Sequence, residues 1–191
     1  MKKSLIAMSL GSLVLLGACG QKQTSKLSHK TEEKMFMKDD KMTNHNTMMT
    51  DKDKTIDFSL MGIDGKTYKL SDFKGKKVYL KFWASWCSIC LSSLPDTEEL
   101  AMEQGEDYVV LSVISPNQKG EKSAEEFKKW YDGLQYKHIP VLLDEGGKMM
   151  EAFGIRAYPT SVFIGSDGAL AETHVGFMSK MDIKNKLEAI R

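Results

Sequence analysis

Apolar and polar residues alternate along the chain from Thr55 onward, and the alternation is interrupted by a turn signal at Asp64 and Gly65. The apolar positions on either side of that turn are Ile56, Phe58, Leu60, Tyr68 and Leu70. A period of two on both sides of an Asp-Gly pair is typical of a β-hairpin. The pattern therefore predicts that a β-hairpin opens the folded part of the chain.

Two continuous apolar runs follow, at residues 78–83 and 108–114. Their length and their β-branched and aromatic side chains favour buried strands. The segment between them, from about residue 88 to residue 104, predicts a helix. A strand, a helix and a second strand in this order form a β-α-β unit, in which the two strands lie parallel in one sheet.

Local signals predict the remaining elements. Ser123 and Glu126 form a capping box at the start of one helix, and Ser179 caps the last one. Between these helices the pattern predicts a strand at 139–143, a short helix at 148–153, and a hairpin of strands at 161–164 and 170–175. This order of elements predicts an α/β sandwich with parallel central strands covered by helices.

The N-terminus is typical of a secretory signal. Two lysines precede an apolar run at residues 5–16, which is shorter than the ~20 residues that a membrane span needs. Residues 16–19 resemble a bacterial lipobox, in which the cysteine takes a diacylglycerol thioether. We expect residues 1–18 to be a signal peptide and Cys19 to anchor the chain in the lipid bilayer, on the extracytoplasmic face of the cell membrane. The alternative is an ordinary signal peptide with an incidental cysteine.

Residues 19–54 are predicted to form a flexible tether that starts at the lipidated cysteine. They are rich in Lys, Thr, Asp, Asn and Met, with Leu27 and Phe36 as the large branched or aromatic apolar side chains, so they cannot bury a core. About thirty disordered residues span roughly 30 Å. Methionines interspersed with His29 and His45 are suitable copper ligands, but we favour a low-complexity linker or a sacrificial oxidant sink.

The overall charge argues against a nucleic-acid partner. The 191 residues include 27 basic and 26 acidic ones, so the chain has no global field that would steer it onto nucleic acid. With 41% hydrophobic and 28% charged residues, the chain can bury one core, which we place in a single domain at residues 55–191.

The cysteine count restricts the chemistry. Of the three cysteines, Cys19 is assigned to lipid, and only Cys87 and Cys90 remain. In an oxidising compartment a lone Cys-x-x-Cys pair is either redox-active or half of a metal site. A structural zinc site needs two further ligands, but the chain has no second cysteine pair and its four histidines are scattered. We therefore expect a redox-active pair, with no metal and no cofactor.

The position of the pair assigns a role to each thiol. Cys87 follows a predicted strand and begins a predicted helix, where free backbone N–H groups and the helix dipole stabilise a thiolate. Cys87 is therefore the expected nucleophile. Cys90, one turn further on and less exposed, is expected to resolve the mixed disulfide.

The domain at 55–191 resembles the TlpA and ResA type of membrane-tethered bacterial thiol-disulfide oxidoreductases. The matching pieces are residues 82–90, 139–143, 155–160 and 175–177. The resemblance implies a thioredoxin fold, a three-layer α/β/α sandwich with an N-terminal β-hairpin and a β-α insertion. It also implies that Pro159 follows a cis peptide bond and faces the disulfide, that the backbone at Tyr158 pairs with a substrate strand, and that Gly176 allows close approach of a partner.

Three positions depart from that family's pattern. Ile89 stands where members often have proline, Ser93 where many have a glutamate, and Lys81 where thioredoxins have a buried acid. Lys81 and the two residues between the cysteines, Ser88 and Ile89, are therefore predicted to tune the redox potential. Lys81 lies on the same side of its strand as Trp83, so burial should lower its pKa unless its stem bends into solvent or pairs with a carboxylate.

Other side chains near the pair have structural interpretations. We expect Trp83 in the core and Trp86 exposed beside the nucleophile, in the substrate groove. His174 is expected to be a surface or hydrogen-bonded histidine, and not a ligand. The charge-rich run at 121–129 is expected to be the solvated face of a helix.

These features favour a reductant of partner-protein disulfides. The resemblance implies a membrane thiol transporter of the CcdA or DsbD type as electron donor. Two clients are considered, apocytochrome c and a surface methionine sulfoxide reductase, and we favour the second because the chain is exposed and methionine-rich. Two alternatives stay open: a copper carrier like the Sco proteins, which use Cys-x-x-x-Cys, and a disulfide-forming oxidase with a potential near about −120 mV.

Overall fold

The structure, a computed structural model, describes residues 57–191. The predicted signal peptide, Cys19 and the predicted tether lie outside these residues. The strands are β1 (Ser59–Gly62), β2 (Thr67–Lys69), β3 (Lys77–Phe82), β4 (Tyr108–Ile114), β5 (Val141–Leu143), β6 (Thr160–Ile164) and β7 (Leu170–Val175). The α-helices are α1 (Ser88–Ser92), α2 (Leu94–Glu103), α3 (Ala124–Tyr131), α4 (Lys148–Ala152) and α5 (Lys180–Ala189).

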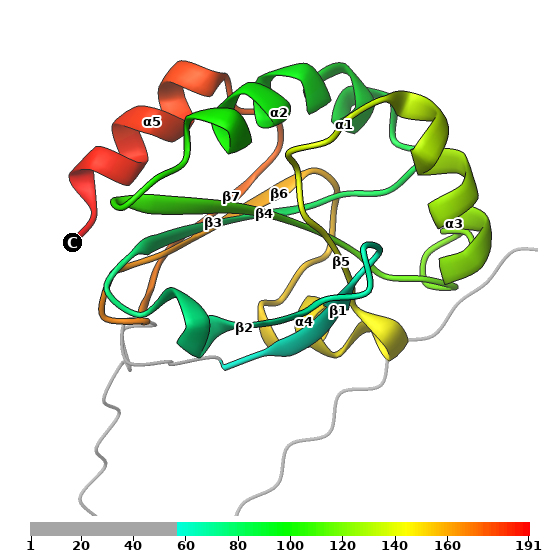
Figure 1. Cartoon of the computed structure of the whole chain (residues 1–191), viewed down its shortest axis with the longest axis horizontal. Helices are drawn as coiled ribbons and strands as arrows, with labels where there is room; N and C mark the ends of the chain where they lie inside the picture. The colour runs from blue at the N-terminus through cyan, green and yellow to red at the C-terminus, as the bar shows by residue number, and fades with distance from the viewer. Residues whose placement is uncertain (1–56) are drawn as a thin grey trace, which may run out of the picture. The chain divides into compact units, whose positions relative to one another are not determined.

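The strands form one mixed sheet in the order β2-β1-β5-β4-β3-β6-β7. β3, β4 and β5 run parallel, whereas β6 runs antiparallel to β3 and β7 antiparallel to β6. The hairpin β1-β2 joins the sheet through β5. In Figure 1, α1, α2, α3 and α5 lie along one side of the sheet and α4 lies on the other. This arrangement confirms the predicted α/β class, including the N-terminal hairpin.

Strand β3 separates two hydrophobic clusters. Tyr79 and Trp83 belong to the cluster that also contains both cysteines of the pair, under the helices α1, α2, α3 and α5. Leu80 and Phe82 belong to the cluster on the opposite face. Because successive side chains of a strand point to opposite faces, Lys81 lies on the same face as Trp83, the face that α1 and α2 cover.

The predicted helix at 88–104 is two helices, which meet at Ser93. Pro95 lies in the first turn of α2 and lacks the N–H group that a continuous helix would direct at the carbonyl of Leu91. Proline is tolerated in the first turn of a helix, so the chain ends α1 and starts α2 at this point. Ser93, at the break, is hydrogen-bonded to the carbonyl of Cys90.

The local capping signals are confirmed. Ser123 and Glu126 form the reciprocal capping box of α3, and the Ser179 side chain accepts a hydrogen bond from the backbone N–H of Asp182 at the start of α5. The strand expected at 139–143 begins only at Val141. Pro140 has no N–H for the ladder, although its carbonyl still accepts a hydrogen bond from Ser112 N at 2.9 Å.

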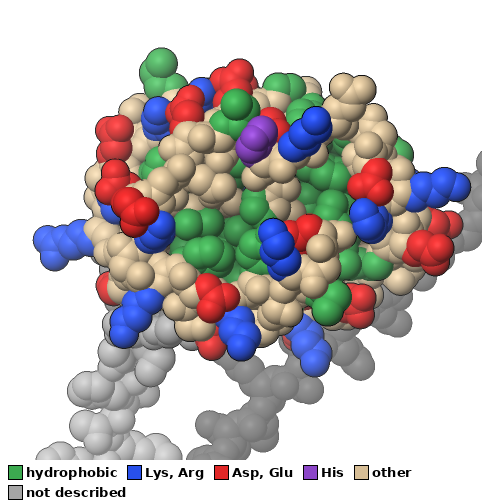
Figure 2. Space-filling view, in the orientation of Figure 1, with side chains coloured by type: hydrophobic (Ala, Val, Ile, Leu, Met, Phe, Trp, Pro, Cys, Tyr) green, Lys and Arg blue, Asp and Glu red, His purple; other side chains and the backbone are tan. Residues whose placement is uncertain are grey.

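The surface shows mixed charge. In Figure 2, lysine and arginine side chains are interspersed with acidic ones on the described part of the face in view. This distribution agrees with the near balance of 27 basic and 26 acidic residues. None of the helices within residues 57–191 is both long enough and apolar enough to cross a membrane.

Candidate active site

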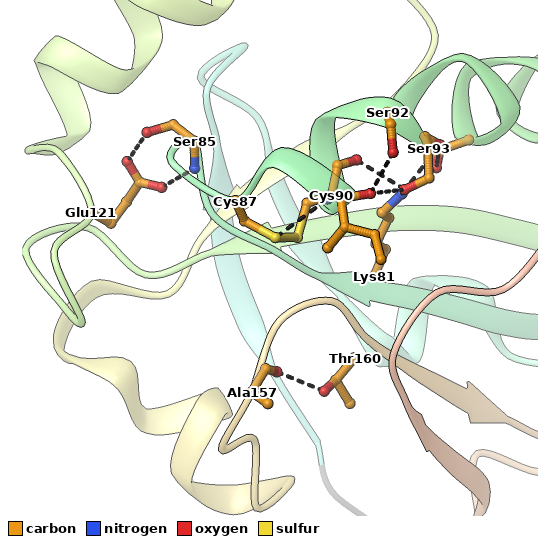
Figure 3. Close-up of a disulfide and its surroundings, with 11 residues drawn as sticks. Lys81, Ser85, Cys87, Cys90, Ser92, Ser93, Glu121, Ala157 and Thr160 are labelled. Carbon is orange, nitrogen blue, oxygen red and sulfur yellow. Dashed lines mark hydrogen bonds between the residues drawn. A yellow bond between two sulfur atoms is a disulfide. The ribbon is translucent and has the colours of Figure 1, made fainter.

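Cys87 and Cys90 form a disulfide with an S–S distance of 2.04 Å and a Cα–Cα distance of 5.2 Å (Figure 3). Cys87 is the N-cap residue of α1, and its Sγ accepts a hydrogen bond from the backbone N–H of Cys90 at 3.3 Å. Cys87 keeps 5% of its surface exposed, and Cys90 is fully buried. The end of β3 and the start of α1 therefore hold the pair with one sulfur nearer to solvent.

This geometry suits thiol-disulfide exchange. In the reduced protein, the N–H group that points at Sγ of Cys87 favours the thiolate, which is the attacking species. The thiolate attacks one sulfur of a partner disulfide and releases the other as a partner thiolate. Cys90 then attacks the mixed disulfide at Cys87, so that the partner leaves with both thiols reduced and the chain keeps the disulfide.

The predicted groove residues lie around this end of the sheet. Trp86 is 53% exposed, and its ring centroid lies 5.9 Å from that of Tyr158. The Tyr158–Pro159 peptide bond is cis. Thr160 pairs with Phe82 across β3 and β6, which places Pro159 at the end of the sheet where the cysteine loop begins. The structure thus brings Trp86, Tyr158 and Pro159 together.

Gly176 directly follows β7 and lies beside Pro159. Its backbone N–H donates to the Pro159 carbonyl at 2.8 Å, and its φ of 107° is a conformation that other residues rarely adopt. A Cβ at Gly176 would meet no atom within 4 Å, so the space beside it is open. Val175 and Phe177 on either side are 63% and 48% exposed, which makes this rim apolar.

Lys81 is buried beneath the active-site helices, with 3% of its surface exposed. Its Nζ donates to the Ser93 hydroxyl at 2.7 Å, the Ser93 carbonyl at 3.2 Å and the Thr97 hydroxyl at 2.8 Å. Burial lowers the pKa of Lys81 to about 8, although the charge of Asp96 acts in the opposite direction. The alternative expectation, a stem bent into solvent or paired with a carboxylate, is wrong, because hydroxyl and carbonyl oxygens receive the ammonium group.

Ser93 connects this lysine to the pair. The Ser93 hydroxyl also donates to the carbonyl of Cys90 at 2.9 Å, so Lys81 and Cys90 share one hydrogen-bonded neighbour (Figure 3). Ser88 and Ile89, between the two cysteines, lie on the surface, and Ile89 is 48% exposed. Of the three predicted tuning residues, only Lys81 therefore lies inside the protein.

Sequence reasoning missed Glu121. The run 121–129 was expected to be a solvated helix face, and this holds for exposed residues of α3 such as Glu125 and Lys129. The interpretation is wrong for Glu121, which is 7% exposed and precedes the Ser123 cap. Its carboxylate accepts hydrogen bonds from the backbone N–H and the hydroxyl of Ser85, two residues before Cys87. The position outside the capping box was the available signal that Glu121 is not a helical residue.

The structure also describes His174, Trp83 and the side chains that could bind a metal ion. His174 is half-buried in β7, opposite Ser161 of β6. Within residues 57–191, no group of three or more His, Cys, Asp or Glu side chains is arranged to hold a metal ion. Trp83, expected in the core, is fully buried.

Comparisons with known proteins agree with this geometry. The Redoxin family model matches residues 48–190. The thiol-disulfide oxidoreductase ResA of Geobacillus thermodenitrificans is 33% identical over 138 residues, which cover 71% of this chain and 75% of ResA. The crystal structure of an exposed lipoprotein thioredoxin of Streptococcus pneumoniae is 62% identical, with a TM-score of 0.69, and the match covers 71% of this chain and all of that one. The chain therefore belongs to the Redoxin family and is a thiol-disulfide oxidoreductase of the ResA type.

Proposed function

We propose that this protein is tethered to the membrane through lipidated Cys19 and reduces disulfides of partner proteins on the extracytoplasmic side. The observation that carries the proposal is the exposure of three large apolar side chains close to the pair: Trp86 precedes Cys87, Ile89 lies between the cysteines, and Phe177 follows Gly176, whose N–H bonds to Pro159. Exposed apolar side chains are typical of surfaces that bind other proteins. They suit contact with a client protein better than contact with a small thiol.

The proposal includes a lipid anchor, an electron donor and a client protein. The lipobox-like residues 16–19 and the likeness to a pneumococcal exposed lipoprotein thioredoxin support a lipid anchor. A thiol transporter of the CcdA or DsbD type is the proposed electron donor. The proposed client is a surface methionine sulfoxide reductase, in preference to apocytochrome c, because oxidised methionines and their repair belong to the same exposed environment.

The direction of electron flow is tested by the redox potential of the isolated domain, residues 55–191. Equilibration with glutathione buffers, followed by alkylation and mass spectrometry, should give a potential closer to the thioredoxin value of about −270 mV than to the DsbA value of about −120 mV. A potential near the DsbA value would contradict a reductant and favour the disulfide-forming alternative.

The lipid anchor is tested separately. Cys19→Ala should release the protein from membranes into the soluble fraction, because two or more acyl chains are needed for stable anchoring and the variant carries none. Its rate of disulfide exchange in solution should equal that of the wild-type domain. Fractionation followed by immunoblotting measures the first effect, and a variant that stays in the membrane fraction would refute the anchor.

A further inference from the structure

We propose that Glu121 is a positioning residue that fixes the turn before the nucleophile and, through its charge, makes the cysteine pair more reducing. This effect acts on the exchange chemistry itself and is therefore the same for every client that the protein reduces. Glu121 and Ser85 join two loops that are 36 residues apart in the chain.

The contact is a buried carboxylate surrounded by donors. The backbone N–H of Ser85 donates to Oε2 at 2.5 Å, the Ser85 hydroxyl donates to Oε1 at 2.6 Å, and the backbone N–H of Lys122 donates to Oε1 at 2.7 Å. Among residues 57–191, no ion pair within 4.0 Å involves Glu121. The groups that bond the carboxylate directly are neutral, and the ammonium group of Lys122 reaches it only through the Ser85 hydroxyl.

The hydrogen bonds between Glu121 and Ser85 hold the turn that leads to Cys87. The backbone N–H of Cys87 donates to the carbonyl of Ala84 at 3.1 Å, which closes a turn with Ser85 and Trp86 at its centre. Both donor groups of Ser85 point at Glu121 (Figure 3), so the carboxylate holds this turn from outside. A shift of Glu121 would move Ser85, two residues before the nucleophile.

The loop that carries Glu121 also contacts the segment that precedes Pro159. Lys119, two residues before Glu121, donates from Nζ to the carbonyls of Ile155 and Arg156 and lies 5.6 Å from the centroid of the Tyr158 ring. Gly120 lies against Trp86, because a Cβ there would be 3.8 Å from the indole nitrogen. The loop that carries Glu121 thus braces both the cysteine turn and the segment before Pro159.

The charge of Glu121 has a defined effect on the pair. A nearby negative charge disfavours the thiolate of Cys87, which raises the free energy of the reduced protein relative to the disulfide form. The equilibrium with other thiols then shifts towards the oxidised chain and the reduced partner. Lys122 opposes this effect, because its Nζ donates to the Ser85 hydroxyl at 2.8 Å on the same side of the turn.

The test compares Glu121→Gln with Glu125→Gln, which removes the same charge from an exposed position on α3. For Glu121→Gln we expect about a tenfold shift of the equilibrium with glutathione towards the reduced protein, which is about 30 mV less negative. The thiolate absorbance of Cys87 should titrate at lower pH. Glu125→Gln should leave both readouts unchanged, and equal behaviour of the two variants would overturn the proposal.

A second variant keeps the proposal falsifiable if Glu121→Gln does not fold. Lys122→Met removes the opposing positive charge from a half-buried position, so the equilibrium with glutathione should shift about threefold in the opposite direction, towards the oxidised protein. Urea unfolding of the disulfide form reports the stability of each variant separately. An unchanged equilibrium, or a shift towards the reduced protein, would overturn the assignment of charge effects to this side of the turn.

Discussion

Replacing Cys90 by alanine should leave the protein covalently joined to its clients, and replacing Cys87 should abolish exchange. In Cys90→Ala the thiolate of Cys87 still attacks a client disulfide, but no second thiol resolves the mixed disulfide, so it accumulates. In Cys87→Ala the remaining thiol is fully buried and cannot reach a client. Turnover of disulfide reduction should fall to the uncatalysed rate in both variants.

The trapped species identify the clients. Membrane fractions from cells that express Cys90→Ala should show additional bands on non-reducing gels that disappear with dithiothreitol, and mass spectrometry of those bands names the partners. The variant with both cysteines replaced is the control for bands unrelated to exchange. Recovery of a methionine sulfoxide reductase would support the proposed client, whereas a Cys90→Ala sample without any disulfide-linked partner would contradict the two-step mechanism.

Lys81→Met should change how stability depends on pH. Burial lowers the pKa of Lys81 from 10.5 to about 8, so between these values the unfolded chain binds more protons than the folded one. The free energy of unfolding of the wild type should therefore rise with pH across this window. The whole shift corresponds to about 3 kcal/mol at 1.36 kcal/mol per pKa unit, and Lys81→Met should lack this rise.

The measurement is urea unfolding of the disulfide forms at pH 7 and at pH 10, where thiol titration plays no part. Below pH 8 the wild type carries the full cost of a buried ammonium group, and the cost disappears as the pH passes through the window. Lys129→Met, which removes an exposed lysine of α3, is the control and should follow the wild type. Parallel stability curves for wild type and Lys81→Met would mean that Lys81 titrates as a solvated side chain.

The same variant should change the redox chemistry. At neutral pH Lys81 is mainly cationic beneath the pair, and its field favours a thiolate at Cys87 or Cys90. Without that charge, the thiolate absorbance of Cys87 should titrate at higher pH and the potential should become more negative by a few tens of millivolts, where each 30 mV is about 1.4 kcal/mol. Glu121→Gln should shift the potential in the opposite direction. Measuring both variants therefore distinguishes the effect of the Lys81 charge on the potential from that of the Glu121 charge.

Local patterns predicted those parts of the structure that local forces determine. The helix caps at Ser123 and Ser179, the turns and strand β4 lie within a residue or two of expectation, because each is indicated by residues that are close together in the sequence. The break at Ser93 could have been predicted from Pro95. The contact between Ser85 and Glu121 could not, because it joins positions 36 residues apart whose spacing depends on how α1, α2 and β4, which lie between them in the chain, pack together.

For Lys81, the sequence predicted the direction of the side chain but not its hydrogen-bond partners. The alternation of β3 predicted that the side chain points into the protein, but the oxygens that receive its ammonium group come from the region where α1 and α2 meet. Their position depends on where the helix breaks. The cis peptide before Pro159 was expected from resemblance to a family, since no periodicity or spacing in this chain indicates it.

The strand order also determines how late in chain synthesis the sheet can be completed. The interior strand β3 has one partner, β4, that follows it closely in the chain, but its other partner, β6, comes about 80 residues later. While the chain emerges in the N-to-C direction, one edge of β3 stays unpaired until residue 164 is available. Until then Cys87 and Cys90, which follow β3 in the chain, lie next to an open sheet edge, so we expect wrong strand pairing and wrong disulfides to form most easily before residues 160–164 are made.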